Sequence, residues 1–236
     1  MQVSEVLVEL QALGSERYKN TLMKNHGVLE PFFGVKIGDM KSIQKRIKKD
    51  YQLALDLFAT GNYDAMYFAG LIADDAKMTK KDLNRWVKLA KNAGIATATV
   101  AWVAAESPHG YELALQWIES KRPLTAAAGW ATLSSLVSIR PDSELDIKHF
   151  KALIGRVKKS IHSEADIVRY HMNNFIIAAG CYIKDLNQAA VEAGKAIGPV
   201  TADLGNNNCK IPSAPDYINK VAKMGRIGVK RKTAKC

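Results

Sequence analysis

The sequence is a succession of amphipathic helical patterns with short turns between them, and this leaves few choices of fold. Apolar residues recur three and four positions apart in segment after segment, as at Val6, Leu7 and Leu10 near the start. This spacing places side chains on one face of an α-helix. Alternation of apolar and polar residues never persists beyond a few positions, so we find no convincing β-strand. The sequence therefore predicts an all-α fold.

Turn and capping residues divide these helices into pairs. Gly61 lies between helical patterns at residues 51–58 and 63–73, which predicts an antiparallel pair joined by a tight turn. Thr79 and Asp82 have the spacing of a capping box that begins the next helix. Further helical patterns cover residues 94–106, 108–118, 123–137, 147–157, 168–182 and 186–197, and a last one ends at Met224.

The helices of about 10 to 15 residues recur with a loose period of about 30 to 40 residues, which is typical of HEAT-like and armadillo-like solenoids. Because the repeat is degenerate in sequence, a compact helical bundle is the alternative fold. We predict an α-α superhelix of HEAT-like helical repeats with a concave basic face, as a single domain over residues 1–218. Residues 219–236 are predicted to form a loose basic tail.

The charge of the chain favours an acidic partner. Lys and Arg number 34 against 23 Asp and Glu, which gives a net charge of +11 and a pI near 9.5. Nucleic acid, an anionic membrane surface and an acidic protein all fit this excess. No run of about 20 apolar residues is present, so no segment is predicted to span a membrane. The N-terminus lacks the pattern of a signal peptide, and we expect a cytoplasmic protein.

The three cysteines, Cys181, Cys209 and Cys236, are far apart and odd in number. They are typical of reduced thiols rather than of a disulfide framework. No CxxC or HxxxH pair is present, so we expect neither a zinc site nor another metal, and no cofactor. The Gly- and Asn-rich loop at residues 203–212 is typical of a structural loop with left-handed turns. The alternative is that this loop forms part of a functional site.

Basic residues gather in three segments. Residues 32–49 (FFGVKIGDMKSIQKRIKK) combine a turn-rich entry with a helix that has one apolar stripe and a basic remainder. A second group stands between two helices near residue 160, and residues 220–235 hold seven basic and no acidic residues. Each segment is either a solvated surface or a phosphate-binding one. The candidate phosphate-binding residues are Lys41, Lys45, Lys48, Lys158, Lys159, Arg169, Arg226, Lys230, Arg231 and Lys232.

Two segments resemble a known family. Residues 32–49 and the helix pair at residues 56–75 (DLFATGNYDAMYFAGLIADD) resemble the bacterial DNA alkylation repair (AlkD-like) proteins. The family has a similar turn, G(V/I)xxxx(L/M)xxIxK, followed by a YEARxLA-like helix that residues 63–69 (YDAMYFA) match loosely. The resemblance covers most of the chain in length and helix order.

This resemblance implies HEAT-like repeats around a positively charged concave cleft that holds duplex DNA. It also implies an activity, because the active members of the family are DNA glycosylases that release N3- or N7-alkylated purines without flipping the base into a pocket. If the chain is active, we expect a DNA-alkylpurine glycosylase, a hydrolase of N-glycosyl bonds. The ten basic residues above are then candidate DNA contacts.

The sequence departs from the family at the catalytic residues. Family glycosylases place a Trp and an Asp on a helix that corresponds to residues 94–106, an Arg on the following helix and a second Trp farther on. Thr99 stands about where the Asp is expected, with Ile95 in place of the first Trp. The following helix has no Arg before Arg140, and Phe175 or a neighbour replaces the second Trp. Thr99 cannot supply the negative charge with which the Asp stabilises the oxocarbenium-like sugar.

A displaced site is one alternative. Thr99, Trp102 and Glu106 share one helix face, so Glu106 is a candidate carboxylate and Trp102 a candidate aromatic wall. Glu106 lies about 10 Å from Thr99 along the helix axis, and a solvated Glu is common at a helix end. Trp102 and Trp130 are also typical core residues.

Functions of different classes therefore stay open. The first is a DNA glycosylase for alkylated bases with a rearranged active site. The second is a non-catalytic HEAT-repeat protein that binds duplex DNA, alkylated or not, without excising a base. A protein-binding scaffold is a third, since HEAT stacks often bind proteins. The missing carboxylate favours the DNA binder, whereas the resemblance favours DNA alkylation repair as the single best description.

Overall fold

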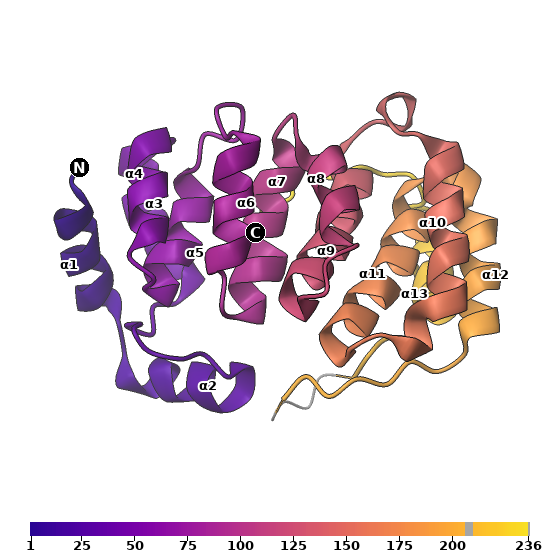
Figure 1. The fold of residues 1–236 in the computed structure, drawn as a ribbon, viewed down its shortest axis with the longest axis horizontal. Helices are drawn as coiled ribbons and strands as arrows, with labels where there is room; N and C mark the ends of the chain where they lie inside the picture. Colours follow the sequence, from indigo (N-terminus) through magenta and orange to yellow (C-terminus); the bar gives the residue numbers. More distant parts are fainter. Residues whose placement is uncertain (206–209, 236) are drawn as a thin grey trace.

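The computed structural model describes residues 1–205 and 210–235. Over these residues the chain is helical and contains no β-strand, which confirms the predicted all-α fold. The helices pack in antiparallel pairs, and successive pairs stack side by side along the long axis of the molecule (Figure 1). This arrangement is the superhelix of HEAT-like repeats that the sequence predicts.

Two rows of helices make up the repeats, and we call the more deeply buried one the inner row. The outer row consists of α4 (Tyr51–Ala59), α6 (Lys80–Leu89), α8 (Gly110–Trp117), α10 (Ile147–Ser160) and α12 (Asn187–Ile197). The inner row consists of α5 (Tyr63–Ile72), α7 (Ala101–Glu106), α9 (Pro123–Ile139), α11 (Asp166–Tyr182) and α13 (Ala214–Lys223). In this row α9 packs against both α7 and α11, and α13 packs against α11. Because the chain reverses direction at each turn, the inner helices all run the same way.

Local sequence signals set the bounds of several helices. The predicted capping box is present, since the side chains of Thr79 and Asp82 each accept a hydrogen bond from the backbone N–H of the other. The pattern at residues 94–106 forms one helical unit as expected, but it begins as the π-helical turn η1 (Ile95–Val100) before α7 continues it.

Two hydrophobic clusters fill the space between the rows and meet at the half-buried Trp102. Phe58 stacks on Trp86 in the first cluster, with ring centroids 4.1 Å apart. Trp130 packs against Phe175 in the second, at 5.2 Å. Trp130 is only 1% exposed, so it is a core residue.

One buried carboxylate fixes the N-terminal part of the chain, where α1 (Val3–Leu13) and α2 (Glu16–His26) lead to α3 (Ile37–Ile47). Asp64 of α5 is 1% exposed. Its carboxylate accepts hydrogen bonds from three successive backbone N–H groups, those of Phe33 (2.6 Å), Gly34 (3.0 Å) and Val35 (3.1 Å).

The turn that Asp64 holds requires glycine at position 34. Gly34 has a φ of +76°, and a Cβ on it would lie 2.7 Å from the backbone nitrogen of Lys19, so both conformation and space exclude a side chain. Burial raises the pKa of Asp64 above its ordinary value, while the three N–H donors act in the opposite direction. The FFGV turn and the YDAM helix, which lie in the two segments that carry the family resemblance, are therefore in direct contact.

The C-terminal segment, residues 224–235, lies against the repeats instead of forming the loose tail that the sequence suggested (Figure 1). It crosses the C-terminal ends of the inner helices in reverse order. The N–H of Gly228 donates to Cys181 O at the end of α11 (2.8 Å), and that of Arg231 to Ser138 O at the end of α9 (2.7 Å). Farther on, the N–H of Ala234 donates to the Glu106 carboxylate at the end of α7 (2.8 Å).

The basic residues of the C-terminal segment fit these helix ends. The last carbonyls of a helix have no partner inside it and carry a partial negative charge. Lys230 Nζ donates to Val137 O (2.8 Å) and pairs with Asp142 (2.7 Å). Lys235 Nζ lies 3.0 and 2.8 Å from the two carboxylate oxygens of Asp75. The segment thus supplies donors and positive charge where four inner helices end.

Substitution of Asp64 tests the contact between the turn and α5. Asp64→Asn keeps the shape but removes the charge and turns an amide NH₂ towards N–H donors, so we expect a loss of about 3 kcal/mol in the free energy of unfolding. Asp56→Asn on the exposed face of α4 is the control, with an expected change within about 0.5 kcal/mol. Urea unfolding followed by circular dichroism measures both. Equal, small effects would contradict the structural role of Asp64.

Glu106→Ala tests the docking of the C-terminal segment. The variant removes the acceptor for Thr233 Oγ1 and the Ala234 N–H, so we expect a loss of about 1–3 kcal/mol in unfolding free energy. The released segment should also be cut faster by trypsin. Glu112→Ala removes an exposed ion pair with Lys80 and should cost less than about 1 kcal/mol. Unchanged trypsin cleavage in Glu106→Ala would show that the segment does not depend on this contact.

Candidate nucleic-acid interface

The ten predicted basic residues lie in three parts of the molecule rather than on one surface. The three groups are Lys41, Lys45 and Lys48 on or just after α3; Lys158, Lys159 and Arg169 where α10 ends and α11 begins; and Arg226, Lys230, Arg231 and Lys232 in the C-terminal segment. Whether these residues can contact one DNA molecule therefore depends on which of the groups lie on the same side of the helix stack.

Lys48 and the third group lie along what we call the C-terminal edge, the ends of the inner helices together with residues 224–235, whereas Lys41 and Lys45 lie within α3. Asp75 links the two parts of this edge, because its carboxylate pairs with Lys49 (3.2 Å), which is next to Lys48, and with Lys235 of the C-terminal segment (2.8 Å). Lys230 is half-buried and engaged with Val137 and Asp142. The exposed cations of this edge include Lys48, Lys49, Arg226, Arg231 and Lys232.

A second set of cations lies at the opposite ends of the inner helices, which we call the N-terminal edge. Each outer helix ends there, and the inner helix of the same pair begins there. Arg122 Nη2 donates to the carbonyl of Lys88 (3.3 Å), which joins the start of α9 to the end of α6. The exposed cations of this edge are Lys88, Lys91, Lys121, Arg122, Lys158, Lys159 and Lys195.

The cations of the N-terminal edge recur with the repeat. Lys88, Lys121, Lys158 and Lys195 stand about 35 residues apart, which is the length of one helix pair. Lys88 and Lys158 lie in the last turn of α6 and of α10, and Lys121 follows the end of α8. These three cations therefore occupy corresponding places where an outer helix ends, and they offset the partial negative charge of that end. Sequence analysis named Lys158 and Lys159 as candidates and did not name the others, although their spacing by one repeat is visible in the sequence.

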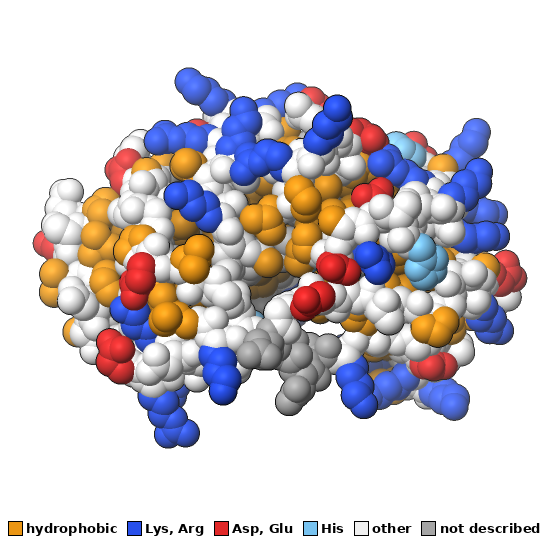
Figure 2. Space-filling model, turned by 60° about the horizontal axis from the view of Figure 1, so that its bottom comes forward, with side chains coloured by type: hydrophobic (Ala, Val, Ile, Leu, Met, Phe, Trp, Pro, Cys, Tyr) orange, Lys and Arg blue, Asp and Glu red, His pale blue; other side chains and the backbone are white. Residues whose placement is uncertain are grey.

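Figure 2 turns this side of the molecule towards the viewer. The visible wall of a hollow on this side is largely apolar, acidic side chains lie at its right-hand rim, and most Lys and Arg side chains stand farther out. Arg169 belongs to this side but is engaged: its guanidinium donates to Thr201 O (2.8 Å) and Glu164 O (3.0 Å) and pairs with Asp166. It ties the chain after α12 to the start of α11.

Thr99 lies in the core. Its side chain is 0% exposed, and its hydroxyl has no hydrogen-bond partner. A Cβ on Gly70 of α5 would overlap with Cγ2 of Thr99, so α5 and η1 touch at this point. Thr99 presents no atom to a substrate outside the helices.

Trp102 and Glu106 do not form a site with Thr99. Trp102 is half-buried and meets Tyr67 edge to face, with ring centroids 5.8 Å apart. One carboxylate oxygen of Glu106 accepts hydrogen bonds from Thr233 and Ala234. The carboxylate suggested as a displaced catalytic group is thus an anchor of the C-terminal segment.

The two positions at which the sequence analysis expected family tryptophans are also in the core. Ile95 is 1% exposed and Phe175 is 0% exposed. Phe175 packs between Trp130 and Phe150, with ring centroids 5.2 and 6.2 Å away. Neither position offers an aromatic surface to DNA.

The remaining sequence candidates divide between described and undescribed residues. In the loop at residues 203–212, positions 206–209 lie outside the described residues, as does Cys236. Burial raises the pKa of the Cys181 thiol to about 11, so it is a protonated core thiol. Among the described residues no cluster of His, Cys, Asp and Glu suits a metal ion, and no helix there is long and apolar enough to cross a membrane.

His171, two residues after Arg169, adds no positive charge to the interface. It lies in α11, is 9% exposed, and packs against the ring of Tyr170. Burial lowers its pKa to about 4. The imidazole is therefore neutral at pH 7, and its role is in the packing of α11.

The neutral His171 predicts a pH dependence of stability. Between pH 6.5 and 4 the unfolded chain binds a proton at this position that the folded protein does not bind. The free energy of unfolding should therefore fall as the pH is lowered through this range, by up to about 3 kcal/mol from this residue. The difference between wild type and His171→Phe in urea unfolding, measured from pH 7 to 4, isolates the contribution. A difference that does not vary with pH would contradict it.

The chain is similar in sequence to a known protein family and to two bacterial proteins. A family model described as DNA alkylation repair enzyme matches residues 6–218. The uncharacterized protein Lin0241 of Listeria innocua is 35% identical over 219 residues, which cover 90% of this chain and 93% of the relative. The uncharacterized protein Lmo0209 of Listeria monocytogenes is 34% identical with the same coverage.

A solved structure is also similar to the whole chain. It is described as a new family of proteins related to the HEAT-like repeat DNA glycosylases with affinity for branched DNA structures. It matches with a TM-score of 0.91 and 37% sequence identity, over 100% of both chains. The resemblance that the FFGV and YDAM segments suggested is therefore confirmed, and so is the HEAT-like fold.

Proposed function

Because this chain belongs to the family of DNA alkylation repair enzymes, we propose that it is a non-catalytic member that binds branched DNA through its two basic edges. The observation that carries the proposal is that neither of the two candidate catalytic residues is available to a substrate. Thr99 is completely buried, and Glu106 is engaged by the C-terminal segment. A glycosylase needs a negative charge that faces the sugar, and neither residue provides it.

Duplex DNA fits the N-terminal edge by charge and by spacing. Neighbouring helices pack about 8–10 Å apart, so cations in four successive repeats form a row of about 25–30 Å. A row of that length faces about eight base pairs at 3.4 Å each. The predicted concave basic face belongs to this proposal, with the hollow beside the N-terminal edge as its counterpart (Figure 2).

A branch point fits the presence of two edges. The N- and C-terminal edges lie at opposite ends of the inner helices, and α9, with 17 residues, measures about 25 Å. A straight duplex along one edge leaves the cations of the other unused. A junction has arms that diverge, so one arm contacts Lys158 and Lys159 while another contacts Arg231 and Lys232. The affinity for branched DNA described for the similar structure supports this choice.

Release of N3- or N7-alkylated purines is the second candidate function, and family membership favours it. The test is incubation with duplex DNA that contains 7-methylguanine or 3-methyladenine, followed by measurement of the free base. We expect no release above the buffer control. Release that scales with enzyme concentration would overturn the non-catalytic proposal, and its loss in Glu106→Gln would identify Glu106 as the carboxylate.

Charge reversal tests the two edges. We expect a four-way junction to bind more tightly than a duplex of the same sequence, with an affinity that falls steeply with salt. Lys158→Glu with Lys159→Glu, and Arg231→Glu with Lys232→Glu, should each weaken junction binding about tenfold or more. Lys81→Glu with Arg85→Glu, on the exposed face of α6, is the charge-matched control and should change affinity by less than about threefold. Fluorescence anisotropy at several salt concentrations measures all of these.

The outcomes separate the alternatives. Equal binding of junction and duplex would contradict the preference for branches. Binding that all three double variants weaken equally would show that net charge alone is responsible. If neither DNA binds even at low salt, both DNA functions fall and a protein-binding scaffold takes their place.

A further inference from the structure

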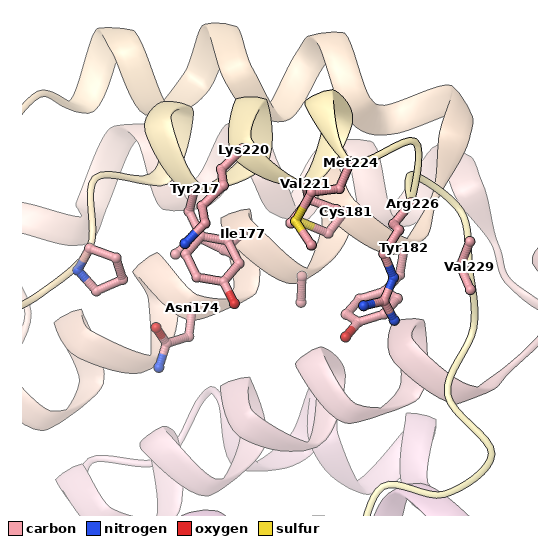
Figure 3. Close-up of a pocket in the computed structure, with 12 residues that line it drawn as sticks. Asn174, Ile177, Cys181, Tyr182, Tyr217, Lys220, Val221, Met224, Arg226 and Val229 are labelled. Carbon is pink, nitrogen blue, oxygen red and sulfur yellow. The ribbon is translucent and has the colours of Figure 1, made fainter.

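A cavity of about 490 Å³ lies between α11, α13 and the C-terminal segment, and of the edge cations described above only Arg226 lines it. Its size falls within the range of pockets that hold small ligands, about 300–1,000 Å³. Apolar side chains from α11 and α13, among them Ile177 and Val221, form part of its wall, with Cys181. Figure 3 shows these residues from the side of the opening.

The cavity is lined by two cations and two aromatic rings, which suit a ligand with an anionic group and a planar ring. Lys220 of α13 and Arg226 of the C-terminal segment both line it, and Figure 3 shows their side chains extending towards α11 from the two ends of the opening. The ring of Tyr217 lies beside Lys220, and that of Tyr182 lies beside Arg226. No acidic residue is among those that line the cavity in the described part of the chain.

Large apolar side chains around the opening of the cavity are exposed to solvent. Tyr217 is 47% exposed, Met224 58% and Val229 49%, and all three line the cavity. Large apolar side chains this exposed at one opening mark a place where a partner group removes them from water. An aromatic ring stacked on Tyr217 would do so, whereas an inorganic anion would not.

The walls of the cavity are held in place before any ligand arrives. A Cβ on Gly180 would lie 2.6 Å from Cδ1 of Ile218, so α11 and α13 pack in direct contact below the cavity. The N–H of Arg226 donates to Val221 O (3.2 Å), and that of Gly228 donates to Cys181 O (2.8 Å). The turn that carries Arg226 is therefore fixed at both sides.

From this arrangement we infer that the cavity binds one nucleotide, with its base against the exposed ring of Tyr217 and its phosphate attracted by the cations Lys220 and Arg226. Aromatic side chains hold an unpaired base by stacking, whatever its identity, and nearby cations hold its phosphate. The nucleotide is either an unpaired one in DNA or a free mononucleotide, since both present the same groups. That DNA is its source rests on the proposed function; binding of a nucleotide as such does not.

Nuclear magnetic resonance titration with AMP and with inorganic phosphate tests the site directly. We expect AMP to shift the backbone amide signals of residues in the cavity, such as Tyr182, Lys220 and Val221. Tyr217→Ala should weaken AMP binding at least fivefold, while Tyr217→Phe keeps the ring and should stay within twofold. Tyr217 is half exposed, so neither variant disturbs the core. Equal shifts with phosphate and AMP, or shifts outside the cavity, would overturn the inference, because the base would then not be recognised.

DNA probes separate the two sources. Junctions with and without two unpaired nucleotides at the branch are compared in wild type, Tyr217→Ala and Tyr217→Phe. If DNA is the source, Tyr217→Ala weakens binding of the junction with unpaired nucleotides at least fivefold and leaves the fully paired junction unchanged. If AMP binds at the cavity but both junctions bind all variants equally, the ligand is a free nucleotide. Failure of AMP and of the unpaired junction to depend on Tyr217 removes the cavity site, while junction binding by the two edges still stands.

Discussion

The ends of the inner helices are the constraint on which this structure depends. Five helices in parallel alignment bring their unpaired carbonyls to one edge and their unpaired N–H groups to the other. At the C-terminal edge the chain provides its own partner, because residues 224–235 bring backbone N–H groups, Lys230 and Lys235 to four helix ends. At the N-terminal edge α2 contacts the chain after α6 through Asn92, and the chain after α12 contacts α11 through Arg169. Between these contacts, lysines repeat where the outer helices end. Our proposal is that these lysines attract an anion from outside.

The features of the fold that depend on neighbouring residues could be predicted from the sequence. The contacts between residues distant in sequence could not. Helical periodicity, Gly61 and the Thr79–Asp82 capping box gave the helix pairs correctly, since each depends on neighbours in sequence. The docking of the C-terminal segment could not be predicted from local patterns, because the N–H of Ala234 donates to Glu106, which lies 128 residues earlier. The contact of Asp64 with Gly34 spans 30 residues and links the two segments that carry the family resemblance.

The candidate site was predictable in its chemistry but not in its geometry. The excess of positive charge was visible in the sequence. The resemblance suggested Thr99 at the place of the family carboxylate, and the structure shows that Thr99 is buried against Gly70. Glu106 looked like a displaced carboxylate because helical spacing shows a shared face but not what covers it. The lysines of the N-terminal edge recur with the repeat, whereas the cavity beside Tyr217 depends on how α13 and the segment after it return to α11.

The central claim is that two edges of one solenoid hold different arms of a DNA branch. Lysine acetylation footprinting by mass spectrometry, with and without a four-way junction, tests it most directly. The account predicts that the junction protects Lys121, Lys158 and Lys159 on one edge and Lys48 and Lys232 on the other. Lys81 on the outer face of α6 should react at the same rate throughout. Protection of one edge alone, or protection that includes Lys81 to the same degree, would contradict the two-edge account.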